Sequence, residues 1–138
     1  LLSRRQRQMC IRDSSRYARG VNVVDWPMSR LLISYFASRY VRVVTRMPVR
    51  DATAGFVGYR RRVLEAIDLG RVRMNGYGFQ IEMKYTAWRL GFRIEEVSII
   101  FIDRTEGTSK MSGGIFGEAF FGVMALPFRR IAAAKKPD

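Results

Sequence analysis

The sequence predicts an α/β domain, because segments with helical spacing of apolar residues alternate with short apolar runs typical of strands. A second observation is composition: 48% of the 138 residues are hydrophobic and 12% are aromatic, which is enough to build a packed core. A third is that the sequence contains neither an internal repeat nor a low-complexity linker. Together these observations indicate one domain, or a piece of one.

The first fourteen residues, LLSRRQRQMCIRDS, differ from the rest. They are polar and basic, begin without Met and show no helix or strand period, so a nucleic-acid-binding tail is one interpretation. They also resemble translated adapter sequence that contaminates assembled reading frames, and we expect residues 1–14 to be a non-native leader. The basic character of the chain does not depend on them, since their four arginines, offset by Asp13, account for a small part of the net charge of +13.

A long helix is predicted over residues 28–47, where apolar residues recur at helical spacing. Asp25 and Pro27 stand where a helix cap and first turn belong. With about 100° per residue, Arg30 and Ser34 share one face of this helix. The opposite face carries three arginines, at Arg39, Arg42 and Arg46. Two separate polar sites on one helix indicate more than a structural role.

The middle of the chain is predicted to form a loop, a short strand at 56–59, a helix at about 60–67 and a second helix at 78–91. Gly91 should end the second helix, since glycine is the usual left-handed terminator. The segment FRIEEVSIIFI at 92–102 should then form one strand. Because it is apolar on both faces from Val97 onward, we expect a central strand covered by helices on both sides.

The last element is predicted to be a helix at residues 113–130, followed by a basic tail at 131–138. Between Ile115 and Phe128 only Glu118 is charged, and basic residues flank this run. It is shorter than the roughly 20 apolar residues of a membrane span. One interpretation is an amphipathic helix in the interface of an anionic membrane, and the other is a helix docked on the domain or on a partner. In either case Pro127 should end or kink it.

Net charge and residue usage limit which ligands and which kinds of catalytic or metal site the chain can have. Lys and Arg number 25 against 12 acidic residues, which favours an anionic partner such as nucleic acid, a phosphorylated small molecule or an acidic membrane surface. Histidine is absent, which removes the usual general base, and the single Cys10 excludes an intrachain disulfide and a cysteine-rich zinc cluster. The sequence has no GxxxxGK[ST] loop, no GxGxxG turn and no Asp-x-Asp pair to hold a metal on nucleotide phosphates, so we predict no metal site in it.

The segment IIFIDRTEGTSKMSGG at residues 99–114 is the strongest candidate site. An apolar run passes directly into Asp103 and Arg104, and Ser109 with Lys110 follows. Two cations, a hydroxyl and several backbone amides fit an anion, most commonly phosphate. The alternative is a charged surface turn.

Five motifs, in order and at matching separations, resemble those of the polyprenol-phosphate (dolichol-phosphate) mannosyltransferases, which are family 2 glycosyltransferases of GT-A, Rossmann-like fold. The resemblance extends from about Ser15 to Arg130. The motifs are SRY at 15–17, WPMSRLLIS at 26–34, PVRDATAGFVGYRR at 48–61, GYGFQIEM at 76–83 and DRTEGTSKMS at 103–112.

The resemblance implies an inverting enzyme that transfers mannose from GDP-mannose to a polyprenol phosphate, as a step in lipid-linked sugar supply for protein glycosylation. It implies a peripheral location at the cytoplasmic face of a membrane, Mg or Mn as a cofactor of the intact enzyme, no nucleic-acid partner, and room for a membrane-anchoring subunit or domain. The nucleophile would be a phosphate oxygen that is already ionised, so no strong protein base is needed. That agrees with the absence of histidine.

The resemblance also assigns residues to the two phosphate sites. Arg16, Arg104 and Lys110 would contact the phosphates of the donor, with Arg104 and Lys110 at the transferring centre as the catalytic residues. Arg30 and Ser34 would bind the phosphate of the acceptor.

Five further residues are assigned by the resemblance to the surroundings of the site. Gln80 and Glu82 would lie near the sugar, and we do not expect Glu82 to act as a base. Asp51, Thr53 and Gly55 would shape the loop that borders the acceptor site, and a purely structural role is the favoured interpretation for each.

The chain also departs from the family, because it lacks the strand that reads the nucleoside and the Asp-x-Asp metal site. We therefore expect residues 15–112 to be the C-terminal, acceptor-side half of a truncated catalytic domain, inactive alone. One alternative is transfer of another sugar, such as glucose or an aminoarabinose relative. The other is a non-catalytic basic module for nucleic acid or acidic lipid, which is less favoured because the aromatic residues fall on predicted core positions.

Overall fold

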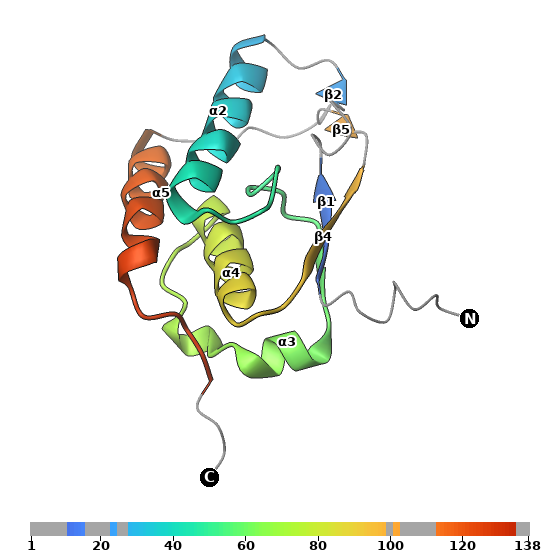
Figure 1. Ribbon diagram of the computed structural model, residues 1–138. Coiled ribbons are helices and arrows are strands. Elements are labelled where there is room, and N and C mark those ends of the chain that lie inside the picture. Colours follow the sequence, from blue (N-terminus) through green and yellow to red (C-terminus); the bar gives the residue numbers. More distant parts are fainter. Residues whose placement is uncertain (1–10, 16–22, 25–27, 99–100, 103–112, 135–138) are drawn as a thin grey trace, which may run out of the picture.

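The computed structural model describes residues 11–15, 23–24, 28–98, 101–102 and 113–134. Helices and strands interleave along the chain, in agreement with the predicted α/β class (Figure 1). The elements are β1 (Ile11–Ser15), β2 (Val23–Val24), α2 (Met28–Thr45), β3 (Val57–Tyr59), α3 (Arg61–Ala66), η1 (Leu69–Arg71), α4 (Tyr77–Arg89), β4 (Ile94–Ser98), β5 (Phe101–Ile102), α5 (Gly113–Ala125) and η2 (Leu126–Phe128).

The described strands form two small sheets. In the larger one, β1 lies between β3 and β4, antiparallel to β3 and parallel to β4, with Ile11 opposite both Tyr59 and Ile94. In the smaller one, β2 pairs in parallel with β5. Strand β1 begins inside the segment 1–14 that we expect to be a non-native leader, so four of those residues take part in the sheet. Their origin stays a prediction.

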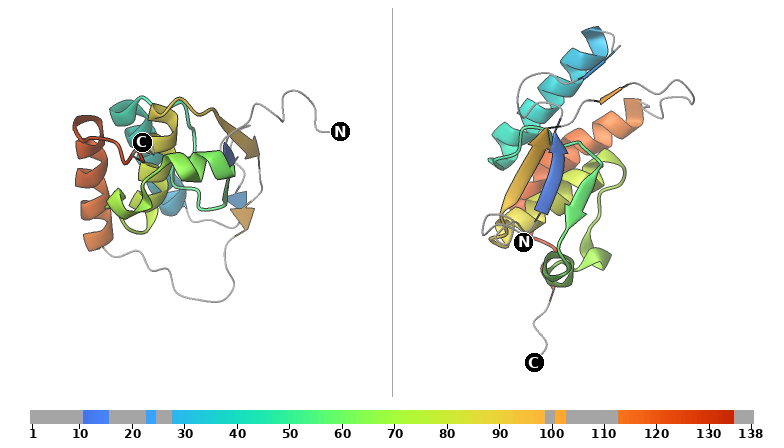
Figure 2. Two further views of the ribbon diagram at one scale, coloured as in Figure 1. Left: turned by 90° about the horizontal axis from the view of Figure 1, so that it is seen from below. Right: turned by 90° about the vertical axis from the view of Figure 1, so that its right-hand side faces the viewer.

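The single strand predicted at 92–102 is wrong in two respects. It is divided into β4 and β5, which belong to different sheets. Among the described strands β4 lies at an edge, and Val97 is 38% exposed. Helix α4 covers one face of the larger sheet, with α5 beyond it, and no described helix covers the other face (Figure 2). Only alternate residues of β4, Ile94 and Glu96, therefore turn inward.

Local signals placed the helices well. The predicted helices at 28–47, 60–67 and 78–91 are confirmed as α2, α3 and α4. Arg46 ends α2 with φ of 59°, and Gly91 follows α4 with φ of 90°, the left-handed conformation that glycine adopts most readily. Helix α5 ends at Ala125 and continues as the 3₁₀ turn η2, because Pro127 cannot extend an α-helix.

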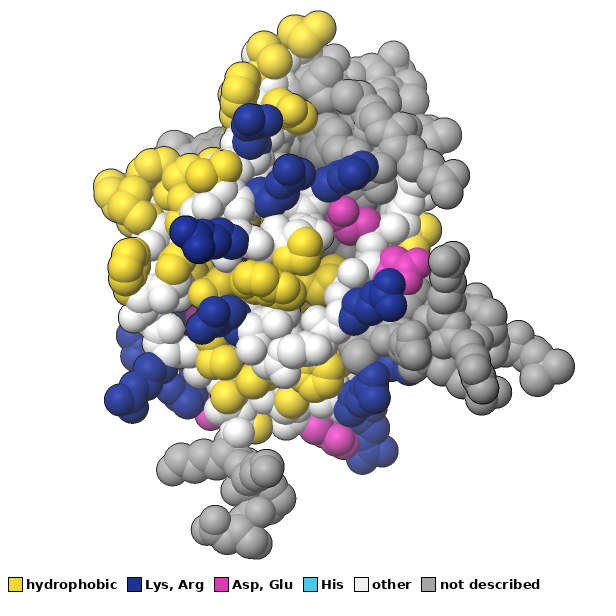
Figure 3. Space-filling view, in the orientation of Figure 1, with side chains coloured by type: hydrophobic (Ala, Val, Ile, Leu, Met, Phe, Trp, Pro, Cys, Tyr) yellow, Lys and Arg dark blue, Asp and Glu magenta, His cyan; other side chains and the backbone are white. Residues whose placement is uncertain are grey.

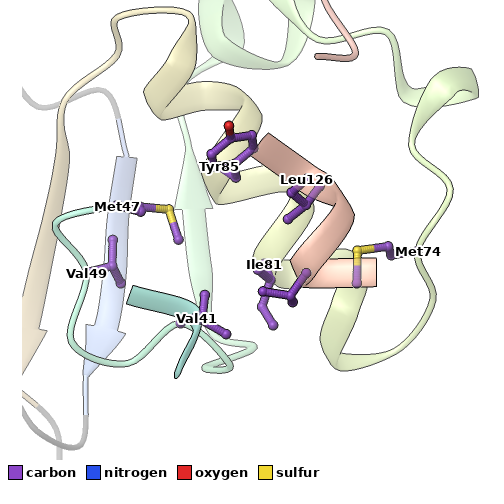
Figure 4. Packing of buried hydrophobic residues seen from close by; sticks show 9 residues of the cluster. Val41, Met47, Val49, Met74, Ile81, Tyr85 and Leu126 are labelled. Atoms are coloured by element: carbon purple, nitrogen blue, oxygen red, sulfur yellow. The ribbon is translucent and has the colours of Figure 1, made fainter. Parts of the chain in front are cut away.

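The main core lies where α2, α4, α5 and the segment after α2 meet (Figure 4). Its central helix is α4, in which every residue from Ile81 to Ala87 is buried. Met74 packs against two glycines: a Cβ added at Gly78 or at Gly122 would lie 2.6 Å from Met74 Cε. The buried residues of this cluster are Val41, Met47, Val49, Ala52, Met74, Ile81, Tyr85, Val123 and Leu126.

A second core cluster joins α3 to α4, and the segment after η2 returns to it. Val63, Ile67, Met83 and Ala87 form this cluster. The end of the described chain runs beside α3: Asp68 N donates to Ala132 O at 2.8 Å and Ala134 N to Ala66 O at 2.9 Å. Part of the predicted basic tail, residues 131–134, is thus attached to the domain.

Candidate functional site

The loop at residues 47–56 begins where α2 ends, and we call it the acceptor-side loop after the role that the family resemblance predicts for it. The Thr45 hydroxyl donates to Val41 O at 2.7 Å and accepts from Met47 N at 3.3 Å, so the turn out of the helix is fixed. Met47 and Val49 are then buried in the main core. The loop leaves the core at its far end, where Phe56 is 83% exposed.

The acceptor-side loop lies against a buried lysine of α4. Lys84 is 0% exposed, and its Nζ donates to three backbone carbonyls of the loop. The distances are 3.3 Å to Asp51 O, 3.2 Å to Ala52 O and 2.9 Å to Ala54 O. An ammonium group has three N–H donors, so it can serve three carbonyls. They compensate for the loss of hydration that makes a buried charge costly.

A carboxylate holds the same loop from β4. Glu96 Oε1 accepts from Arg50 N at 2.8 Å and from Asp51 N at 2.9 Å. Asp51 therefore gives its backbone N–H to a carboxylate and its backbone C=O to an ammonium group. The loop is therefore fixed both by α4 and by β4.

Three predicted loop residues lie together in this arrangement. The side chain of Asp51 is fully buried, and the Thr53 hydroxyl donates to Asp51 Oδ1 at 3.4 Å. Gly55 is exposed, and a Cβ added there would meet nothing within 4 Å. The burial of Asp51 is compatible with the structural role favoured from the sequence, and its place beside an acceptor stays a prediction.

Glu82 holds a different loop. It is buried at 6% exposure, and its Oε2 accepts from Arg73 N at 3.1 Å and from Met74 N at 2.9 Å. The carboxylate thereby fixes the segment that precedes α4 and places Met74 in the core. These two hydrogen bonds give Glu82 a structural role in the fold. Gln80, on the same helix, is half-buried.

The phosphate-binding residues predicted from the sequence are only partly placed. Ser34 lies on α2 and is half-buried. Arg30 is on the same helix, but its side chain lies outside the described part of the chain. Arg16, Arg104 and Lys110 also lie outside the described residues. Their roles stay predictions, and the structure neither joins nor separates the two phosphate sites.

Helices α2 and α5 present exposed apolar side chains beside basic ones (Figure 3). We call this area the α2–α5 surface. Its exposed apolar residues are Met28, Leu32, Ile33, Tyr35 and Phe36 from α2, and Phe120, Phe121, Met124 and Phe128 from α5 and η2. Its exposed arginines are Arg39, Arg42, Arg46, Arg129 and Arg130. Since five of these side chains are aromatic, the expectation that aromatic residues fall on core positions is wrong for this area.

An aromatic pair joins the two helices of this surface. The rings of Tyr40 and Phe120 stack with centroids 4.6 Å apart and planes 10° apart, and the Tyr40 hydroxyl donates to Phe120 O at 3.0 Å. Burial raises the pKa of the Tyr40 hydroxyl, because it disfavours the phenolate. On the other side of α5, Val123 and Leu126 are buried in the core. Both interpretations of the 113–130 segment are thus compatible with α5: one face docks on the domain and the other is exposed.

Sequence reasoning missed Lys84 and Glu96, although each leaves a signal. Lys84 falls at core spacing on α4 with Ile81 and Tyr85, and a charge within an apolar helical face indicates a buried ion. Glu96 falls on the same face of β4 as Ile94. Their partners are backbone groups up to 46 residues away, and no local pattern identifies them.

No helix in the described part of the chain has the length and apolar character needed to cross a membrane. Within those same residues, Asp, Glu and Cys form no group of three that could hold a metal ion. The described side chains therefore do not fit the metal that the family resemblance implies, and we derive no chemical step through it.

No family model matches the chain. Several curated relatives do, among them the following two. It is 48% identical over 109 residues to the undecaprenyl-phosphate mannosyltransferase of Micrococcus luteus. The aligned region covers 79% of this chain and 45% of that protein. It is 46% identical over 109 residues to the polyprenol monophosphomannose synthase of Mycolicibacterium smegmatis, covering 79% of this chain and 41% of that protein. The chain thus spans less than half the length of both relatives.

Proposed function

We propose that this chain is the acceptor-side, C-terminal part of the GT-A catalytic domain of a polyprenol-phosphate mannosyltransferase. The observation that carries the proposal is homology: identity of 48% and 46% over 109 residues to two enzymes named for mannose and for a polyprenyl phosphate. These names favour mannose over glucose or an aminoarabinose. A basic nucleic-acid module has no comparable support, although exposed aromatic residues occur on the α2–α5 surface.

The proposed reaction suits a chain without histidine. An ionised oxygen of the polyprenol phosphate attacks the anomeric carbon of GDP-mannose, the bond from that carbon to the diphosphate oxygen breaks, and GDP leaves with the electron pair. The configuration at the anomeric carbon inverts. The attacking oxygen carries no proton at neutral pH, so the step needs no protein base. The engagement of Glu82 by Arg73 N and Met74 N agrees with this chemistry.

In this proposal cationic side chains do the main work. Arg104 and Lys110 bind the diphosphate of the donor, with Arg16, and stabilise the negative charge that develops as GDP leaves. Arg30 and Ser34 bind the phosphate of the acceptor. Mg²⁺ or Mn²⁺ would be held by the part of the enzyme that this chain does not include, so the 138 residues alone should be inactive.

The proposal places the enzyme on the cytoplasmic face of a membrane, as a peripheral protein. Its support is the α2–α5 surface, where exposed apolar side chains such as Phe121 and Phe128 lie beside exposed arginines such as Arg42 and Arg129. Apolar side chains that enter the acyl region and arginines that contact anionic headgroups are the usual components of an interfacial site. A membrane-anchoring subunit or domain could supply further attachment.

The test is mannose transfer from GDP-mannose to undecaprenyl phosphate by a full-length enzyme carrying this sequence. Arg104→Ala and Lys110→Ala should each lower kcat by about 10²–10³, since each removes a charge aimed at the transition state. Arg104→Lys should be nearly as slow as Arg104→Ala, because a lysine cannot donate two parallel bonds to one phosphate.

The matched control is Arg42→Ala, which removes an exposed cation from α2. Its turnover in detergent should stay near that of the wild-type enzyme. If the Arg104 and Lys110 variants all keep wild-type rates, residues 103–112 are a charged turn and the proposed roles are wrong.

A further inference from the structure

Lys84 is a charged residue in the longest buried stretch of the described residues. It belongs to α4, whose residues from Ile81 to Ala87 are all buried, and its own side chain is 0% exposed. Burying an ammonium group is costly unless donors and acceptors match. A straight apolar side chain could fill this core position without that cost, so the positive charge calls for another explanation.

The contacts of Lys84 supply one. Its Nζ donates to the carbonyls of Asp51, Ala52 and Ala54, and these three described acceptors belong to the acceptor-side loop. Carbonyls of neighbouring peptides in an extended segment point in alternating directions, so three can converge on one atom only if the segment is bent around it. The ammonium group thereby favours one bent conformation of the loop over extended ones.

Glu96 completes the arrangement from β4. Its Oε1 binds the N–H groups of Arg50 and Asp51 at 2.8 and 2.9 Å. Both N–H groups belong to a loop, and Glu96 gives them a charged acceptor, which makes stronger hydrogen bonds than a neutral one. The peptide groups of residues 50–54 are thus held between a positive charge on α4 and a negative charge on β4. Helix α4 also carries Gln80.

We propose that Lys84 and Glu96 are positioning residues, which hold residues 50–54 in one conformation and so fix the acceptor side of the site against α4 and β4. The kinetic part of this inference rests on the proposed mannosyl transfer. Neither residue touches substrate in this account. They act through the backbone of the loop, whose exposed end at Gly55 and Phe56 is free to contact an acceptor.

The first measurement is amide hydrogen exchange of residues 50–54 in the full-length enzyme. Lys84→Met keeps a straight side chain of similar size and removes all three donors, so exchange should become about tenfold faster or more. Glu96→Gln keeps an acceptor oxygen for the two amides and should give a smaller increase. The control is Val63→Ala, which opens the other core cluster and should leave exchange at 50–54 unchanged.

The second measurement separates positioning from general destabilisation. Lys84→Met should raise KM for undecaprenyl phosphate several-fold, while KM for GDP-mannose stays within about twofold, and Glu96→Gln should lie between it and the wild type. Val63→Ala should lower Tm without this split. Unchanged exchange in Lys84→Met, or faster exchange with both KM values unchanged, would overturn the proposal. If the wild-type enzyme transfers no mannose, the proposed function fails, whereas the exchange result still decides whether the two charges hold the loop.

Discussion

The acceptor-side loop and the α2–α5 surface depart from the usual distribution of side chains in opposite directions. Around the loop, charged groups lie inside the protein: Lys84 and Asp51 are both 0% exposed. On the surface, rings lie outside: Phe121 is 68% and Phe128 90% exposed. The buried charge of Lys84 forms hydrogen bonds with carbonyls of the same domain, so these charges serve to hold the loop in the fold. The exposed rings are not covered by the described residues, which is typical of a surface that meets another phase or partner.

If charged groups hold the loop, removing one of them should destabilise the protein. Glu96→Ala should lower the free energy of unfolding by about 1–3 kcal/mol, because the N–H groups of Arg50 and Asp51 lose their acceptor. Urea denaturation monitored by circular dichroism measures this. Its neighbour Glu95 is exposed on the opposite face of β4, and Glu95→Ala should change stability by less than about 0.5 kcal/mol. Equal losses in the two variants would mean that Glu96 contributes no more than a surface charge.

If the α2–α5 surface binds a membrane, changing its exposed rings should weaken that binding while leaving the core intact. Phe121→Asp combined with Phe128→Asp should abolish most binding to vesicles of equal parts phosphatidylglycerol and phosphatidylcholine, because both rings are exposed. Its effect on Tm should be small. Phe120 is left in place, since its ring stacks on Tyr40.

The control for this variant is Val123→Ala, on the docked face of α5, where the side chain is 1% exposed. It should lower stability by about 1–3 kcal/mol and leave vesicle binding unchanged. A large fall in Tm for the double Asp variant would assign these rings to the fold and remove the support for a membrane surface.

The smallest effect concerns the contact between α2 and α5. The folded pKa of Tyr40 is raised, so the folded protein favours the neutral phenol. The contribution of Tyr40 to stability is therefore present below the unfolded pKa of about 10 and decreases as pH rises above that value. The difference in stability between wild type and Tyr40→Phe, measured from about pH 8 to about pH 11, should shift against the wild type above about pH 10. A constant difference would contradict a burial effect on this hydroxyl.

The sequence predicted local structure well and long-range structure poorly, for a physical reason. The helix ends at Gly91 and before Pro127 follow from backbone preferences of single residues, which act without the rest of the fold. The division of residues 92–102 into β4 and β5 depends on which strands are available to pair, and that is a property of the assembled chain.

In the candidate site, too, local features were predicted from the sequence and long-range contacts were not. The motif at 103–112 was found because its residue types suit phosphate, and its role awaits experiment. Lys84 and Glu96 were missed because their partners are backbone groups of a loop, which any sequence can provide. The core spacing of Lys84 with Ile81 and Tyr85 would have identified a buried charge but not the peptides that it binds.

The most direct test of the central claim is sugar transfer by the full-length enzyme carrying this sequence, with GDP-mannose and UDP-glucose as alternative radiolabelled donors and undecaprenyl phosphate as acceptor. We expect mannosyl lipid from GDP-mannose in the presence of Mg²⁺ or Mn²⁺, little product from UDP-glucose, and no product from the 138-residue chain alone. Efficient transfer of glucose, or turnover by the 138 residues alone, would contradict the account of this chain as the acceptor-side part of a mannosyltransferase.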